Sequence, residues 1–358
     1  MPNLRFPEFE GEWDRYKLED IATFLKDRVS SSTLTKDNYV STENILQDFQ
    51  GVIRSQGVPA NFNVMVYKKG DILISNIRPY LKKVWKADRD GGCSADVFVM
   101  RANKTLCNEG FLHHIIANDC FIAYVMSGAK GVKMPRGDKE QMKKYKTSLP
   151  SIAEQKKISS LLNLIDERIA TQNRIIEKYE SLIKGIAKQL AKHTPNTRIA
   201  DCVECHSSTL QENQLDGEGI YKVYGANGLC GYTKTPSISG DSILIVKDGS
   251  GVGNVSYVNG DYSVIGTSNY LTAKESFSLR YIYYCLMVFN FQPYKTGMAI
   301  PHIYFKDYGK AKIYCPKREQ QENIAAILYI IEHKINMEKS IKDLFISQKK
   351  YLLRSMFK

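Results

Sequence analysis

The amino-acid sequence predicts an α+β fold with pseudo-twofold symmetry. Two globular regions, each with a twisted and mostly antiparallel sheet, are joined by two long helices packed as an antiparallel coiled coil. Three observations carry this prediction: an internal repeat, a heptad spacing of apolar residues in each copy, and short β-like runs broken by Gly, Asn and Asp. The predicted order is a globular region at 1–149, a helix at 150–195, a second globular region at 196–315 and a second helix at 316–358.

The repeat is clearest at the two helix starts. "PSIAEQKKISSLLNLIDERI" begins at Pro150, and "PKREQQENIAAILYIIEHKI" begins at Pro316, which lies 166 positions later. The same offset pairs Gln155 with Gln321, and further upstream it pairs Gly131 with Gly297 and Pro135 with Pro301. Two copies are too few for a solenoid, so a pseudo-twofold arrangement is the natural result.

The globular regions contain strand and helix patterns in the same order. Residues 64–77 and 242–273 alternate β-prone runs with turn residues, which predicts strands and hairpins. The apolar runs 110–126 and 279–289 each predict a helix. Each copy therefore reads as a mixed region that ends in a long helix.

Both long helices show an apolar seam. In the first, the seam residues are Ile158, Leu162, Ile165, Ile169, Gln172, Ile176, Tyr179, Ile183, Ile186 and Leu190, and in the second they are Ile324, Leu328, Ile331, Ile335, Ile341, Phe345, Leu352 and Met356. A helix of about 40 residues is about 60 Å long. Such a helix cannot bury its stripe alone, so we expect the two helices to pack on each other.

One polar residue interrupts each seam near its middle. Gln172 interrupts the first, and its equivalent Glu338 interrupts the second. The middles of an antiparallel pair meet, and a polar layer at a seam can fix register. We therefore predict that Gln172 and Glu338 lie close together and set the register of the helices, the alternative being two exposed positions.

Composition bounds the class of protein. The net charge is +12, which favours a polyanionic partner such as nucleic acid over a merely basic soluble protein. No stretch is apolar for the roughly 20 residues of a membrane span, and the start lacks a signal-peptide layout, so we expect a cytoplasmic protein. Its 8 cysteines are then expected to be reduced.

Candidate DNA-binding residues gather in loops of both copies. Lys and Arg bind phosphate, Arg also reads guanine, and small polar side chains contact both backbone and bases. The candidates are Arg78, Tyr80, Lys82, Lys83, Lys130, Lys133 and Arg136 in the first copy, and Lys247, Ser250, Asn254, Lys295, Thr296 and His302 in the second. Different loops on a shared scaffold are what the reading of two different sequences would require.

Two motifs resemble sites but support none. "CVECH" (Cys202, Cys205, His206) matches a haem-attachment pattern without an export signal, and it lacks a second Cys-x-x-Cys for zinc. "DGSGVGN" at 248–254 is followed by a strand-like run, which favours a hairpin turn over a phosphate loop. We predict no catalytic residues and no metal site in this chain.

The sequence resembles a known protein family. "LRFPEFEGEWDRYKLEDIA" and the two Pro-x-x-x-x-Gln-x-x-Ile helix starts resemble the specificity subunit of type I restriction–modification enzymes, over the whole chain. The resemblance implies that each globular region is a target recognition domain for one half of a bipartite double-stranded DNA site. It also implies that the helices fix the spacer between the halves.

The resemblance further implies partners. These are two methyltransferase (modification) subunits and, in the full complex, restriction (motor–nuclease) subunits. S-adenosylmethionine, ATP and magnesium would then belong to those subunits, and this chain would be non-catalytic. The alternative is a dimerising coiled-coil adaptor whose heads bind proteins, which would show no salt-dependent DNA affinity.

Overall fold

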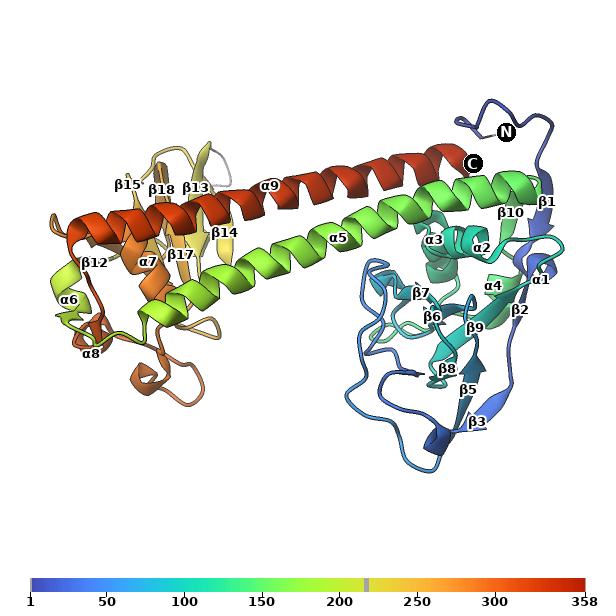
Figure 1. Ribbon diagram of the computed structural model, residues 1–358, viewed down its shortest axis with the longest axis horizontal. Coiled ribbons are helices and arrows are strands. Elements are labelled where there is room, and N and C mark those ends of the chain that lie inside the picture. The colour runs from blue at the N-terminus through green and yellow to red at the C-terminus, as the bar shows by residue number, and fades with distance from the viewer. Residues whose placement is uncertain (1, 216–218, 358) are drawn as a thin grey trace. The chain divides into compact units, whose positions relative to one another are not determined.

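The computed structural model describes residues 2–215 and 219–357, which form two compact units. The first unit comprises Met1–Asn173 and Ser340–Lys358, and the second comprises Arg174–Lys339. Each unit contains one globular region together with one end of both long helices (Figure 1). No helix among the described residues is both long enough and apolar enough to cross a membrane.

The globular region of the first unit alternates short strands and helices. In chain order its elements are β1 Asp14–Lys17, α1 Leu18–Ile21, β2 Ala22–Phe24, β3 Arg28–Ser30, β4 Tyr39–Val40, β5 Asn63–Tyr67, β6 Ile72–Ser75, β7 Val84–Lys86, β8 Gly91–Cys93, β9 Val97–Ala102, α2 Glu109–Ile116, α3 Asp119–Ser127, α4 Lys139–Lys143 and β10 Lys146–Leu149.

The second unit follows the same plan. Its elements are β11 Thr197–Arg198, α6 Ile199–Cys202, β12 Val203–Ser207, β13 Tyr221–Gly225, β14 Gly228–Thr233, β15 Ile238–Ser239, β16 Ser242–Val246, β17 Val255–Val258, β18 Asp261–Val264, β19 Ser268–Ala273, α7 Leu279–Met287, α8 Phe305–Tyr308 and β20 Lys312–Ile313.

The sheets confirm the repeat. One four-stranded sheet has the order β2-β9-β6-β7 in the first unit and β12-β19-β16-β17 in the second, so equivalent strands occupy equivalent places. A further four-stranded sheet in each unit has the order β3-β5-β8-β4 or β14-β13-β18-β15. The pairs β4–β8 and β13–β18 are parallel and the other pairs are antiparallel, which confirms the mostly antiparallel prediction.

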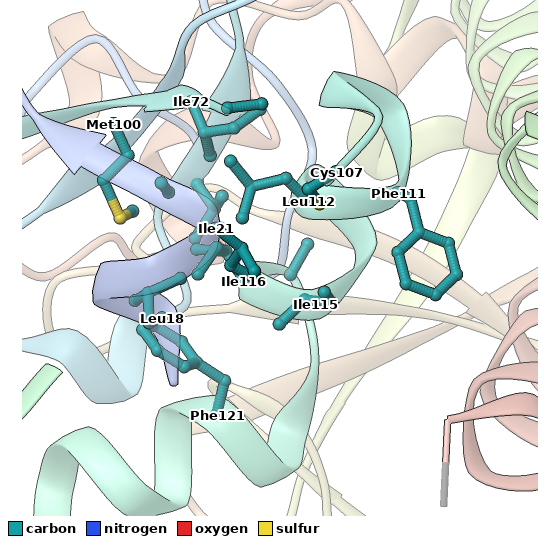
Figure 2. Close-up of a cluster of buried hydrophobic side chains, with 14 of the residues drawn as sticks. Leu18, Ile21, Ile72, Met100, Cys107, Phe111, Leu112, Ile115, Ile116 and Phe121 are labelled. Carbon is teal, nitrogen blue, oxygen red and sulfur yellow. The ribbon is translucent and has the colours of Figure 1, made fainter. Parts of the chain in front are cut away.

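The run 110–126, predicted as one helix, is two. Asn118 separates α2 from α3, because its side chain accepts a hydrogen bond from Cys120 N–H and caps α3. α2 then contacts β6, β7 and β9 of the β2-β9-β6-β7 sheet, and α3 packs beside α2. Figure 2 shows Leu112 and Ile116 of α2 beside Ile21 of α1, and Phe121 of α3 in the same cluster.

The long helices α5 (Ile152–Leu190) and α9 (Arg318–Met356) each contain 39 residues. Their predicted seam residues are all buried or half-buried. In the first unit the beginning of α5 packs with the end of α9, and Lys349 Nζ lies 2.6 Å from Asp166 Oδ1. In the second unit the end of α5 packs with the beginning of α9, and Lys339 Nζ lies 3.2 Å from Glu180 Oε1. Antiparallel packing is thus confirmed within each unit, while the pseudo-twofold relation between units stays a prediction.

The repeated glutamine explains the two similar helix starts. Gln155 Nε2 donates to Pro150 O at 2.9 Å, and Gln321 Nε2 donates to Pro316 O at 2.8 Å. Each amide oxygen accepts from the backbone N–H of a residue that caps another helix: Asn108 before α2, and Ser278 before α7. Each glutamine therefore joins a long helix to the globular region of its own unit.

The two polar seam residues have different surroundings. Glu338 is buried and forms an ion pair with Lys334 at 2.9 Å. The Gln172 Oε1 atom is also buried, and it has no hydrogen-bond partner within the described part of the chain. Because the two residues belong to different units, their proposed pairing stays a prediction.

Candidate nucleic-acid interface

In the first unit, the segment that follows β6 meets a short hairpin. Lys130 and Arg136 exchange two backbone hydrogen bonds of 2.9 Å, closing a hairpin (the first hairpin, Lys130–Arg136). The hairpin is fixed to the segment after β6, because Arg78 N–H donates to Pro135 O at 2.8 Å and Gly137 N–H donates to Asn76 O at 3.1 Å. Candidates separated by more than 50 positions in the sequence are thereby brought to one place.

The second unit repeats this junction bond for bond. Thr296 and His302 close the second hairpin (Thr296–His302) with backbone hydrogen bonds of 2.9 and 2.8 Å. Gly249 N–H donates to Pro301 O and Ile303 N–H donates to Lys247 O, both at 3.0 Å. The backbone is therefore the same in both units, while the side chains that it carries are different.

The candidates after β6 divide into exposed and engaged side chains. Arg78 and Tyr80 are exposed, at the start of a short 3₁₀ helix, Pro79–Leu81. Lys82 Nζ lies 2.8 Å from Asp119 Oδ1 of α3, and Lys83 Nζ donates to Thr42 O. Lys82 and Lys83 thus hold the segment in place, whereas no hydrogen bond or ion pair within the described chain holds the guanidinium of Arg78.

Backbone strain marks the same segment. Arg78 and Lys82 have φ values of 55° and 53°, in the left-handed region that usually suits glycine. The strained turn is supported by Asp48 N–H and Phe49 N–H, which donate to Leu81 O and Lys82 O. A strained backbone conformation that is stabilised by surrounding hydrogen bonds is typical of functional segments.

Carboxylates balance the cations of the first hairpin. Lys130 Nζ lies 2.9 Å from Asp138 Oδ2, and this hydrogen bond is the main cause that lowers the pKa of Asp138. Arg136 lies 3.5 Å from Asp96. These ion pairs are exposed and therefore weak, so a phosphate could replace the carboxylates. Lys133 is exposed at the hairpin tip.

The second junction contains a histidine–carboxylate pair. His302 Nδ1–H donates to Asp248 Oδ1 at 2.7 Å, and Lys247 Nζ lies 3.4 Å from Asp248 Oδ2. These three side chains are partly exposed. Lys247 and Asp248 lie beside the second hairpin, of which His302 is the last residue. Thr296 is the first residue of this hairpin, and Lys295 directly precedes it. Ser250 and Asn254 are exposed in the turn between β16 and β17. All six predicted residues of the second unit therefore lie on this junction or on the turn beside it.

The two weaker motifs also have defined surroundings. Residues 248–254 lie in the turn of the β16–β17 hairpin, which confirms the hairpin interpretation of "DGSGVGN". Cys202 Sγ lies 3.7 Å from Cys315 Sγ, whereas His206 Nε2 lies 2.9 Å from Thr272 Oγ1. The residues of "CVECH" thus serve separate contacts.

Sequence reasoning missed two parts of these junctions. It missed Asp96 and Asp138, which have no local motif. It also missed the exposed apolar residues at the hairpin tips: Val132 and Met134 in the first unit, and Met298 and Ile300 in the second. The offset that pairs Gly131 with Gly297 and Pro135 with Pro301 also pairs these apolar positions. The internal repeat could therefore have identified them from the sequence.

The chain builds the same α+β unit twice, each with a polar junction, which defines a protein of two repeated α+β domains. Residues 10–181 and 196–344 each match the family described as "Type I restriction modification DNA specificity domain". These matches cover most of the chain, and the chain belongs to this family.

Two curated relatives share part of the sequence. The chain is 28% identical over 109 residues to the specificity subunit of the type I restriction enzyme EcoprrI from Escherichia coli, covering 30% of this chain and 27% of that protein. It is 24% identical over 195 residues to the specificity subunit of the type I restriction enzyme MjaVIII from Methanocaldococcus jannaschii, covering 53% of this chain and 44% of that protein. The chain thus spans less than half the length of each of these relatives.

A solved structure shares the whole fold. The crystal structure of the type I restriction–modification system S subunit from M. genitalium matches with a TM-score of 0.70 at 16% identity, over 100% of this chain and 99% of that one. At this identity the likeness concerns the fold.

Proposed function

We propose that this chain is the non-catalytic, sequence-specific DNA-binding specificity subunit of a type I restriction–modification complex. Each globular region reads one half of a bipartite double-stranded target, and the two long helices set the gap between the halves. This role would place the protein in the cytoplasm, where such complexes meet DNA.

The repeated junction is the observation that carries this proposal. The backbone contacts are the same in both units, but the side chains differ: Lys130 and Arg136 correspond to Thr296 and His302, and Arg78 corresponds to Gly249. Phosphate and base contacts depend on side chains, so one scaffold with two side-chain sets suits two different half-sites. The net charge of +12 supports a polyanionic ligand.

We propose that two modification subunits dock on the long helices and that restriction subunits join the full complex. α9 carries exposed apolar side chains at Ile330, Met337, Leu344 and Tyr351, which are spaced by seven residues. Exposed apolar side chains in a regular row are typical of a surface that packs against a partner helix. S-adenosylmethionine, ATP and magnesium are proposed to bind those partners.

The test is genome-wide methylation mapping in cells that express the chain with its modification subunit, against cells that lack the chain. A split motif with a fixed gap that appears only when the chain is present would support the proposal. The control is the same modification subunit paired with another specificity subunit, which shows that it is active. If that control methylates DNA and this chain directs none, the adaptor alternative replaces the proposal.

A further inference from the structure

Both hairpins carry an apolar tip. Between the closing pairs lie the segments Gly131–Pro135 and Gly297–Pro301, and both have the sequence pattern glycine, apolar, any, apolar, proline. Val132 and Met298 are fully exposed, at 100% and 107% of the reference area. The second apolar residues of the tips, Met134 and Ile300, are at least half exposed.

The tips have a defined shape. Gly131 and Gly297 have φ values of +93° and +86°, a conformation that other residues rarely adopt. A Cβ atom at Gly297 would lie 2.3 Å from Ile300 O, so this position requires glycine. At the far side of each tip, Pro135 O and Pro301 O accept the hydrogen bonds from the neighbouring segment. The backbone therefore holds the apolar side chains outward in both units.

Exposure of such side chains in the free chain is unfavourable relative to their burial against a ligand. Two classes of ligand are conceivable: a protein surface or DNA. The core of a protein–protein interface is depleted in charged residues, Lys among them. Here cations adjoin the tips instead, at Lys130, Lys133 and Arg136 in the first unit and at Lys295 in the second. Apolar side chains between cations suit DNA, whose phosphates flank its bases.

We propose that both hairpin tips contact the bases of the target DNA through these apolar side chains, while the neighbouring cations hold phosphates. The proposal rests on the function proposed above and adds the residues that touch bases. Val132 and Met134 serve one half-site, and Met298 and Ile300 serve the other. Apolar side chains reach bases either at a thymine methyl group or between stacked base pairs, and both remove the side chain from water.

The test separates base contacts from phosphate contacts by their salt dependence. The complex of the full chain with its modification subunits is titrated with DNA that carries the split target, at several salt concentrations. Met298→Ala should weaken binding about tenfold and leave the salt slope unchanged, because no phosphate contact is lost. Lys295→Ala should reduce the slope by about one. Ile220→Ala, at an exposed position outside the hairpins, is the matched control and should bind as the wild type does.

The repeat supplies a second control. Val132→Ala should weaken discrimination at one half-site only, and Met298→Ala at the other half-site only. Each variant is thus the control for the other, measured with targets that carry substitutions in one half. Because both positions are fully exposed, the variants should keep the wild-type unfolding midpoint.

Two further measurements distinguish the kinds of base contact. Replacing thymine by uracil in the target should reproduce the effect of Met298→Ala if the tip meets a methyl group. Thymines that become reactive to permanganate in the wild-type complex, and not in the variant, would show insertion between base pairs. Either result supports the proposal.

The proposal is overturned if both alanine variants bind the target as the wild type does. It is also overturned if they lose modification subunits while each assembled complex keeps its DNA affinity, because the tips would then be protein contacts. A wild-type complex that shows no preference for any split target would instead contradict the proposed function, before any variant is compared.

Discussion

Arg78 shows a conflict between backbone and side chain. Its φ value of 55° would suit glycine, yet the residue is an arginine with an exposed guanidinium. Arginine is the side chain that binds both phosphate and guanine. Arginine at a position whose backbone conformation favours glycine is expected to bind a partner rather than to stabilise the fold.

Arg78→Gly should therefore separate stability from recognition. Relief of the left-handed strain, worth about 1 kcal/mol, offsets the greater chain entropy of glycine, so the free energy of unfolding should stay within about 1 kcal/mol. Recognition of one half of the DNA target should be lost or altered, as for any change in the 78–83 segment. Urea unfolding and methylation mapping measure the two effects. Loss of both half-sites together would contradict independent reading by the two units.

Two neighbouring histidines of α2, His113 and His114, are ionisable side chains in a largely apolar environment. His114 is buried and donates from Nε2 to Asn163 Oδ1 of α5 at 3.1 Å, and neither histidine has a partner at Nδ1 within the described chain. Burial lowers the pKa of His113 to about 3, with Lys349 and Lys86 adding to the effect. Burial also lowers the pKa of His114, and His113 and Lys349 contribute. Lys349 itself forms an ion pair with Asp166.

Acidification should destabilise the first unit. Both histidines are neutral when folded but take up protons when unfolded, near pH 6.5. The unfolded state therefore binds more protons between pH 6.5 and about 3, and the free energy of unfolding falls across this window as pH falls. The expected loss is about 1 kcal/mol per histidine per pH unit. Urea midpoints at pH 7.5 and 5.5 measure it, and His113→Gln should lessen the difference. An equal difference in the variant would show that other groups cause it.

At the scale of elements, the buried glutamines fix each long helix to its globular region. Replacing Gln321 with Ala would leave Ser278 N–H and Pro316 O unpaired, since Gln321 bonds both. Unpaired buried groups cost about 1–3 kcal/mol each, so the second unit should lose about 2–6 kcal/mol of stability. Gln155→Ala should do the same in the first unit. The control is Gln189→Ala, at an exposed position of α5, which should change the unfolding midpoint little.

The elements also show how far sequence reasoning reaches. The long helices were predictable, because their stripe of apolar residues is a local pattern and each seam residue is buried or half-buried. The break at Asn118 was missed, because the run 110–126 stays apolar on both sides of a single capping residue. The junctions bring several of the predicted candidates together, but the ion pairs of Lys130 and Arg136 depend on how separate loops meet. The apolar tips were visible only as paired positions of the repeat.

At the scale of the molecule, α5 and α9 both pass from one unit to the other. Lengthening only one helix would shift its seam against the other, so a test of the spacer must change both. Seven residues inserted after Asn173 and seven after Lys339 keep the heptad pattern and add about 10 Å. The preferred gap in the DNA target should then lengthen by up to about three base pairs, at 3.4 Å each. The increase should be smaller where the helical twist of DNA would rotate one half-site away from its globular region. Methylation mapping should show unchanged half-sites, and an unchanged gap would contradict a spacer role for the helices.

A small feature of each unit has a consequence for how such proteins diversify. The chain enters and leaves each globular region on two strands that pair with each other, β1 with β10 and β11 with β20. The paired strands hold the two ends of each globular region together. A foreign segment that begins and ends with the same two strands could therefore replace the region without disturbing the helices. Recombination between related genes could thus exchange one globular region at a time. Under the proposed function, a lineage would gain a new hybrid recognition sequence in a single genetic event, and the spacing between the two halves would stay the same.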